Sequence, residues 1–158
     1  MPQLTIATDP SPAFAGQIAF PMFPRIVMTR FVQQDGGISF GLAVVRAADQ
    51  TVRLPAAAGD VTDAFEGFSV RQEYREANPQ GYSNLEPLPV LRRGFIWVDV
   101  EGPVTEEGAV YARVTANGGL TQLGAIRGDA DTANAVLIPN AKFVTSTTAA
   151  GVAIVEVR

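Results

Sequence analysis

The segment GFIWVDVE, residues 94–101, decides the fold class more than any other stretch of the chain. Successive side chains of a β-strand point to opposite faces of a sheet, so Phe95 and Trp97 share one face, whereas the isoleucine and two valines that alternate with them share the other. Apolar residues on both faces are typical of a strand that is covered on both sides. We expect this strand at the centre of the domain or beneath a partner subunit.

The next apolar segment, AVYARVT (residues 109–115), has a different pattern. Two valines and an alanine point one way, while Tyr111 and Arg113 point the other way. Such alternation is typical of a sheet with one face in the core and one face in water. We therefore predict that Arg113 is solvated.

The rest of the chain also favours short strands. With 15 glycines and 11 prolines, uninterrupted windows long enough for a long helix are rare. Segments rich in β-branched and aromatic residues are bounded by turn residues, which is the signature of strands. These segments are residues 25–31, 40–45, 51–54, 67–71, 123–127, 141–147 and 152–157, and only residues 59–67 and 129–136 could form short helices. The fold predicted is all-β, a compact β-sandwich or β-barrel with an extended N-terminal arm and one long loop.

The arm is residues 1–24, and residues 25–158 form the single predicted β domain. Five prolines prevent regular structure in the arm, yet it is too apolar for a solvated tail. An arm that lies on another protein would resolve this conflict, and an arm packed on its own domain is the alternative. The predicted contact residues of the arm are Phe14, Ile18, Phe20, Met22 and Phe23.

The long loop is predicted at residues 73–93. A loop of this length in a compact domain is usually functional or disordered. It carries tyrosines and arginines, which are enriched at the centres of protein interfaces. We expect it to contact the same partner or a neighbouring copy, through Tyr74, Arg75, Tyr82, Arg92 and Arg93.

Composition excludes several functions. The chain has no cysteine and no histidine, so disulfides, thiolate metal sites and the commonest general base are missing. A net charge of −4 gives no reason to expect binding to nucleic acid or to an anionic membrane. No apolar run is long enough to span a bilayer, and the first residues do not resemble a secretion signal.

No motif predicts an active site, a metal or a cofactor. The stretch RGDADT contains Asp129 and Asp131 at a spacing found in cation loops, but the rest of a calcium loop is absent, and we interpret it as a polar turn. Asp99 with Glu101, and likewise residues 106–107, are paired acids without a catalytic context. We interpret both pairs as solvated strand edges.

Taken in order, several stretches resemble the structural cement proteins of tailed bacteriophages. They are FGLAVV (residues 40–45), FEGFSVR (65–71), the tyrosine-bearing loop that follows, RRGFIWVDVEGPVTEEGAVYARVT (92–115) and GAIRGDADTANAVLIPNAKFVTSTTAAGVAIVEV (124–157). The resemblance is strongest from residue 94 onward and weak over residues 1–36. It implies a small β-barrel or sandwich without catalytic residues, which decorates the outer surface of the capsid after assembly in the host cytoplasm. The implied partners are the major capsid protein and copies of itself, as a dimer or trimer.

Two other functions stay open at this stage. A carbohydrate-binding or host-attachment β module would need a row of exposed aromatic side chains. A small trimeric β-barrel enzyme of the nucleotide-hydrolase kind would need a phosphate-binding loop rich in serine and glycine, which we do not find in the sequence.

Overall fold

The computed structural model describes residues 13–72 and 80–158. Its elements are β1 (Ile18–Ala19), β2 (Ile26–Val32), β3 (Ile38–Ser39), β4 (Ala43–Arg46), β5 (Thr51–Arg53), α1 (Ala58–Ala64), β6 (Phe65–Ser69), β7 (Gly81–Tyr82), β8 (Pro87–Val100), β9 (Ala109–Arg113), β10 (Ile126–Arg127), a 3-10 turn at Asp131–Ala133, β11 (Ala135–Phe143) and β12 (Gly151–Val157). The prediction of an all-β fold is confirmed, α1 overlaps the short helix predicted at residues 59–67, and the 3-10 turn lies within the one predicted at residues 129–136.

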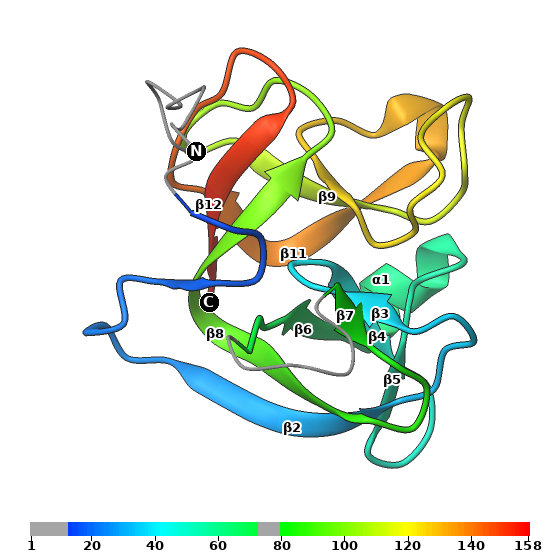
Figure 1. The fold of residues 1–158 in the computed structure, drawn as a ribbon. Helices are drawn as coiled ribbons and strands as arrows, with labels where there is room; N and C mark the ends of the chain where they lie inside the picture. Colours follow the sequence, from blue (N-terminus) through cyan, green and yellow to red (C-terminus); the bar gives the residue numbers. More distant parts are fainter. Residues whose placement is uncertain (1–12, 73–79) are drawn as a thin grey trace, which may run out of the picture.

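The strands form two closed rings that share β8. In the first ring, β8 pairs with β12, which is followed by β11, β9 and β10, and β10 pairs back with β8. In the second ring, β8 pairs with β2, which is followed by β5, β4 and β6, and β6 pairs back with β8. Figure 1 shows the first ring above the second, with β8 running through both. The predicted barrel is therefore two small rings built on one long strand.

Gly94 lies at the junction of the two halves of β8. Its φ of +126° is a conformation that residues with a side chain rarely adopt. A Cβ at this position would lie 3.0 Å from the Cβ of Arg25. Glycine therefore lets the strand pass from one ring to the other while the chain entering β2 packs closely against it.

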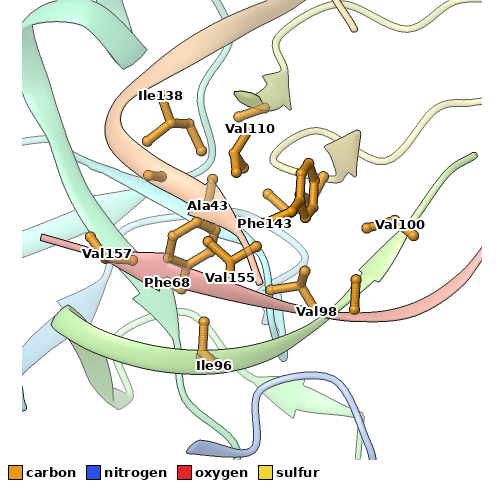
Figure 2. Close-up of a cluster of buried hydrophobic side chains, with 14 of the residues drawn as sticks. Ala43, Phe68, Ile96, Val98, Val100, Val110, Ile138, Phe143, Val155 and Val157 are labelled. Carbon is orange, nitrogen blue, oxygen red and sulfur yellow. The ribbon is translucent and has the colours of Figure 1, made fainter. Parts of the chain in front are cut away.

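Two apolar clusters fill the molecule. One lies within the second ring and includes Val32, Val52 and Val90. The other joins the two rings, because residues from β4 and β6 of the second ring pack against residues of the first ring (Figure 2). Ala43, Phe68 and Leu91 are among the second ring's residues in this cluster, and all three are fully buried. The rings therefore share a core as well as a strand.

The segment 94–101 is less completely covered than its pattern predicted. Ile96, Val98 and Val100 are buried in the core, as expected. On the other face, Phe95 and Trp97 are half-buried, and Asp99 is exposed. The expected cover on this face is therefore only partial, and the N-terminal segment supplies part of it, because Phe20 and Phe23 pack against Phe95.

The loop predicted at residues 73–93 ends earlier than predicted, because β8 begins at Pro87. Residues 87–93 belong to β8, where Pro87 and Pro89 pair with β2. Both prolines are tolerated in this strand although proline cannot donate a backbone hydrogen bond. The alternating pattern continues through them, since Leu88 and Val90 are fully buried in the second ring.

Arg113 is also a correction, because it is fully buried rather than solvated. Its guanidinium forms an ion pair with Glu101 at 2.7 Å and another with Asp131 at 2.9 Å. The hydrogen bond to Glu101, and to a lesser extent the one to Asp131, raises the pKa of Arg113 above its ordinary value. The hydrogen bond that Arg113 donates to Asp131 lowers the pKa of Asp131. Glu101 is therefore an internal ion-pair partner and not a solvated edge, whereas the stretch around Asp129 is a polar turn, as predicted.

Candidate interaction surface

The described part of the arm, residues 13–24, begins with a segment docked on the two rings. The amide of Gly16 donates a hydrogen bond to the Trp97 carbonyl at 2.8 Å, and the Trp97 amide donates to the Gln17 carbonyl at 2.8 Å. The amide of Arg71 donates to the Gly16 carbonyl at 2.7 Å. This segment therefore joins β8 to Arg71, which lies two positions after the end of β6.

Two glycines allow this close approach. A Cβ on Gly16 would lie 2.8 Å from the Cβ of Phe40, and a Cβ on Gly41 would lie 2.8 Å from the amide nitrogen of Gly16. Both glycines have positive φ values, +84° and +72°. Only glycine satisfies both the conformation and the spacing at this contact. Ile18 follows it in β1, half-buried against the core.

The chain then leaves the rings in a tight turn at residues 20–23. The amide of Phe23 donates to the Phe20 carbonyl at 3.0 Å. The rings of Phe20 and Phe23 each pack edge-on against Phe95 of β8, with centroids 5.4 and 5.5 Å apart. Phe20 has a φ of +49°, a strained conformation for a bulky residue, and such strain persists only where surrounding contacts enforce it.

This turn presents apolar side chains to solvent. We call Phe20, Met22, Phe23 and Ile26 the arm patch. Their exposed fractions are 45%, 97%, 56% and 48%. Isolated exposed apolar residues are ordinary, but four within seven positions, on a base fixed by aromatic contacts, are typical of a surface that another molecule covers. The patch contains three of the five predicted contact residues of the arm.

Phe14 lies apart from the arm patch. Its exposed ring faces the guanidinium of Arg71, which lies 5.0 Å from its centroid and also 5.0 Å from the centroid of Phe40. A guanidinium between two rings is held by cation–π attraction on both sides. Phe14 therefore extends the apolar surface at the start of the docked segment.

The predicted loop residues have different outcomes. Tyr74 and Arg75 lie outside the described residues. Tyr82 is fully buried, donates a hydrogen bond to the Val70 carbonyl and packs edge-on against Phe40, so we leave it out of the surface proposed below. Arg92 and Arg93 are exposed, on β8.

Arg92 belongs to an ionic cluster that the sequence did not predict. Its Nε lies 3.8 Å from the carboxylate of Glu66, which also pairs with Arg30 at 2.7 Å and Arg46 at 3.4 Å. The four residues come from β8, β6, β2 and β4. The signal available in the sequence is the presence of charged residues in four otherwise apolar strands, but the convergence of these charges depends on the ring topology.

The described residues contain no group of three histidine, cysteine, aspartate or glutamate side chains that could hold a metal ion. Within the same part of the chain, no helix has the length and hydrophobicity needed to cross a membrane.

Comparisons with known proteins agree with the resemblance noted in the sequence. The profile of one family, described as "Structural cement protein (E217 gp24/Pam3 gp6)", matches residues 2–158. A chain in a solved structure described as "The capsid of Myoviridae Phage XM1" has a similar fold, with a TM-score of 0.73 and 22% sequence identity, over 96% of this chain and 93% of that chain. No curated protein sequence matches. The family profile spans nearly the whole chain, and this protein therefore belongs to the structural cement proteins of bacteriophages.

Proposed function

We propose that this protein binds the outer surface of the phage head and bridges neighbouring major capsid protein subunits, with the arm patch as a principal contact. The observation that carries the proposal is the exposed apolar surface at Phe20, Met22, Phe23 and Ile26, held on Phe95. A protein that binds only the assembled shell stabilises it by mass action. Many copies add their effects, because each one holds subunits that are already neighbours.

Several features support a contact role for this surface. Met22 is 97% exposed, so it contributes little to folding, and its flexible side chain adapts to irregular surfaces. Phe20 keeps a strained backbone in a turn whose ring packs on Phe95, and such strain is often found at functional surfaces. Arg93, which pairs with Ile26 of the arm patch, is proposed as a further contact, as is Phe14, which lies apart from the patch. Tyr74 and Arg75 remain proposed contacts from the sequence. The carbohydrate-binding alternative is weaker, because Tyr82 is buried and Trp97 is half-buried.

The test is co-sedimentation of the purified protein with expanded capsids stripped of it, followed by heating of the shells. We expect saturable binding and a higher temperature of shell disruption. Absence of binding by a folded protein would contradict the proposal and make a screen for sugar binding the next step.

The arm patch is tested by Met22→Asp and Phe23→Asp. A charge buried in an apolar contact without a partner is strongly unfavourable, so we expect at least about a tenfold loss of affinity for shells. The matched control is Leu137→Asp, since Leu137 is also an exposed apolar residue, 47% exposed, on β11. Met22→Asp and Leu137→Asp should keep the thermal stability of the parent, because substitutions at exposed positions usually change it little. Phe23→Asp also removes the ring contact with Phe95, so its melting temperature is measured beside its binding. Unchanged shell binding by both arm variants would exclude the arm patch as the contact.

A further inference from the structure

The second ring has a basic recess at one end, lined by Arg30, Arg46 and Arg92 around Glu66. We propose that this recess binds an acidic side chain, aspartate or glutamate, of a neighbouring protein on the capsid shell. The inference rests on the proposed function and adds the chemistry of the partner. It is supported by the charge balance, the geometry of the ion pairs and the shape of the recess.

Glu66 is the buried anchor of the cluster. Its side chain is 1% exposed, and its Oε1 accepts hydrogen bonds from Arg30 Nε at 2.9 Å while lying 2.7 Å from Arg30 Nη2. This two-pronged contact is a strong and directional form of ion pair. Arg30 alone therefore neutralises the buried carboxylate.

The other two arginines are in excess over this pair. The Nε of Arg46 lies 3.4 Å from Glu66 Oε2, and the Nε of Arg92 lies 3.8 Å from Glu66 Oε1, so both contacts are longer than that of Arg30. Their side chains are 57% and 41% exposed, and Arg92 Nη1 donates to the sulfur of Met28 at 3.2 Å. Three guanidiniums thus face one carboxylate, and two of them present donors to solvent.

The recess itself has a volume of about 440 Å³ and is completed by the turn between β4 and β5, at Ala48, Asp49 and Gln50. Asp49 is exposed, so with Glu66 it offsets two of the three positive charges and leaves a local excess of one. A concave site with excess charge and preorganised guanidiniums attracts and orients an anion. One carboxylate would make the site neutral.

A protein carboxylate suits this site better than a polyanion. The chain as a whole carries a charge of −4, which repels extended nucleic acid, while a single carboxylate needs only the local field. Arginine forks match the planar carboxylate with two parallel hydrogen bonds. The recess is also distinct from the arm patch, so the two surfaces would give the protein separate points of attachment.

The experiment measures binding to stripped, expanded capsids across a range of salt concentrations. The variants are Arg46→Gln, Arg92→Gln and the double variant. The control is Lys142→Gln on β11, which removes one positive charge from an exposed ion pair with Glu107. Hydrogen bonds to charged groups predict a loss of affinity of about ten- to a hundredfold in the double variant. Its binding should also depend less on salt than that of the wild type, whereas the control should match the wild type.

The possible outcomes are separable. If the wild type does not bind shells, the proposed function fails and the inference fails with it. If the wild type binds and the double variant binds equally well with the same salt dependence, only the inference is overturned. If the double variant binds shells normally but self-associates more weakly in sedimentation equilibrium, the recess binds a second copy of this protein. That result would also overturn the inference. Arg46→Gln leaves Arg30 and Arg92 beside Glu66, so it provides a test even if loss of Arg92 impairs folding.

Discussion

At the scale of single residues, Gly16 determines whether the arm can dock. It combines a φ of +84° with backbone and side-chain neighbours at 2.8 to 3.0 Å from the position of a Cβ. We predict that Gly16→Ala destabilises the protein by about 1–2 kcal/mol through its left-handed conformation, and by about 1–3 kcal/mol more through overpacking. The free energy of unfolding in denaturant measures the sum. Hydrogen exchange at the Trp97 amide, which donates to Gln17, reports docking of the arm.

Gly36 offers a matched control for this prediction. Its φ is +83°, but a Cβ there would meet nothing within 4 Å. Gly36→Ala should therefore show only the conformational contribution and should leave exchange at Trp97 unchanged. Equal effects of the two substitutions would mean that the contact of Gly16 with Phe40 and Gly41 does not limit docking.

Two residues show where reasoning from single positions failed. Arg113 alternates correctly with its apolar neighbours, but its face is covered by the loop that carries Asp131, which lies 18 positions later in the sequence. Tyr82 was assigned to an interface from its residue type, yet it fills the second ring's core beside Phe40. In both cases the burial comes from segments distant in sequence, and a local pattern contains no information about them.

At the scale of elements, the sequence predicted the strands better than their ends. The predicted segments at residues 25–31 and 152–157 correspond closely to β2 and β12. The strand predicted at residues 94–101 corresponds to the second half of β8, whereas the first half of β8 lay inside the predicted long loop. The contact residues of the arm were selected because their apolar character conflicts with solvent exposure, and that conflict is visible without a structure. The basic recess cannot be recognised from the sequence, because its four charged residues come from four different strands.

The arm is also a structural element, because β1 occupies an edge of β8 at Phe95 and Ile96. Removal of residues 1–24 would leave this edge unpaired and expose Phe95 and Trp97, and exposed edges promote association between sheets. We predict that the truncated protein self-associates and unfolds at a lower temperature, as measured by analytical ultracentrifugation and thermal melting.

Removal of residues 1–12 is the control for that truncation, because it leaves β1 and its bonds to β8 in place. Comparison of the two truncations therefore isolates the contribution of residues 13–24, and we expect the longer truncation to melt lower and to associate more than the shorter one. A monomeric, equally stable protein lacking residues 1–24 would show that β1 is dispensable for protecting β8. The substitutions at Met22 and Phe23 separate binding from this structural role, since they leave β1 intact.

At the scale of the whole molecule, the sharing of β8 by two rings could not be predicted from the sequence. The alternation of each strand indicates a buried face, but it does not identify the partner of that strand, and most pairings here join segments far apart in the chain. A barrel was predicted as one of two options. The single strand common to both rings emerges only from the register of β2, β6, β10 and β12 on β8.

The shared strand and shared core predict that the rings unfold together. Val90 and Val98 are both fully buried on β8, in the second and first ring respectively. We expect Val90→Ala and Val98→Ala each to lower the free energy of unfolding by about 1–3 kcal/mol. Fluorescence of Trp97, the only tryptophan, and far-ultraviolet circular dichroism should give coincident transitions in both variants, which is the test of two-state unfolding. Separate midpoints would mean that the rings are independent folding units.

The continuity of β8 has a mechanical consequence. Hydrogen bonds in antiparallel pairs run perpendicular to the strands, so a pull along the strand axis loads many of them at once, in shear. A pull across the axis would instead open them one after another, as in a zipper. Tension between an attachment on one ring and an attachment on the other would run along β8. We therefore expect the molecule to behave as a stiff tie in that direction, which suits a protein that holds together a shell under outward pressure.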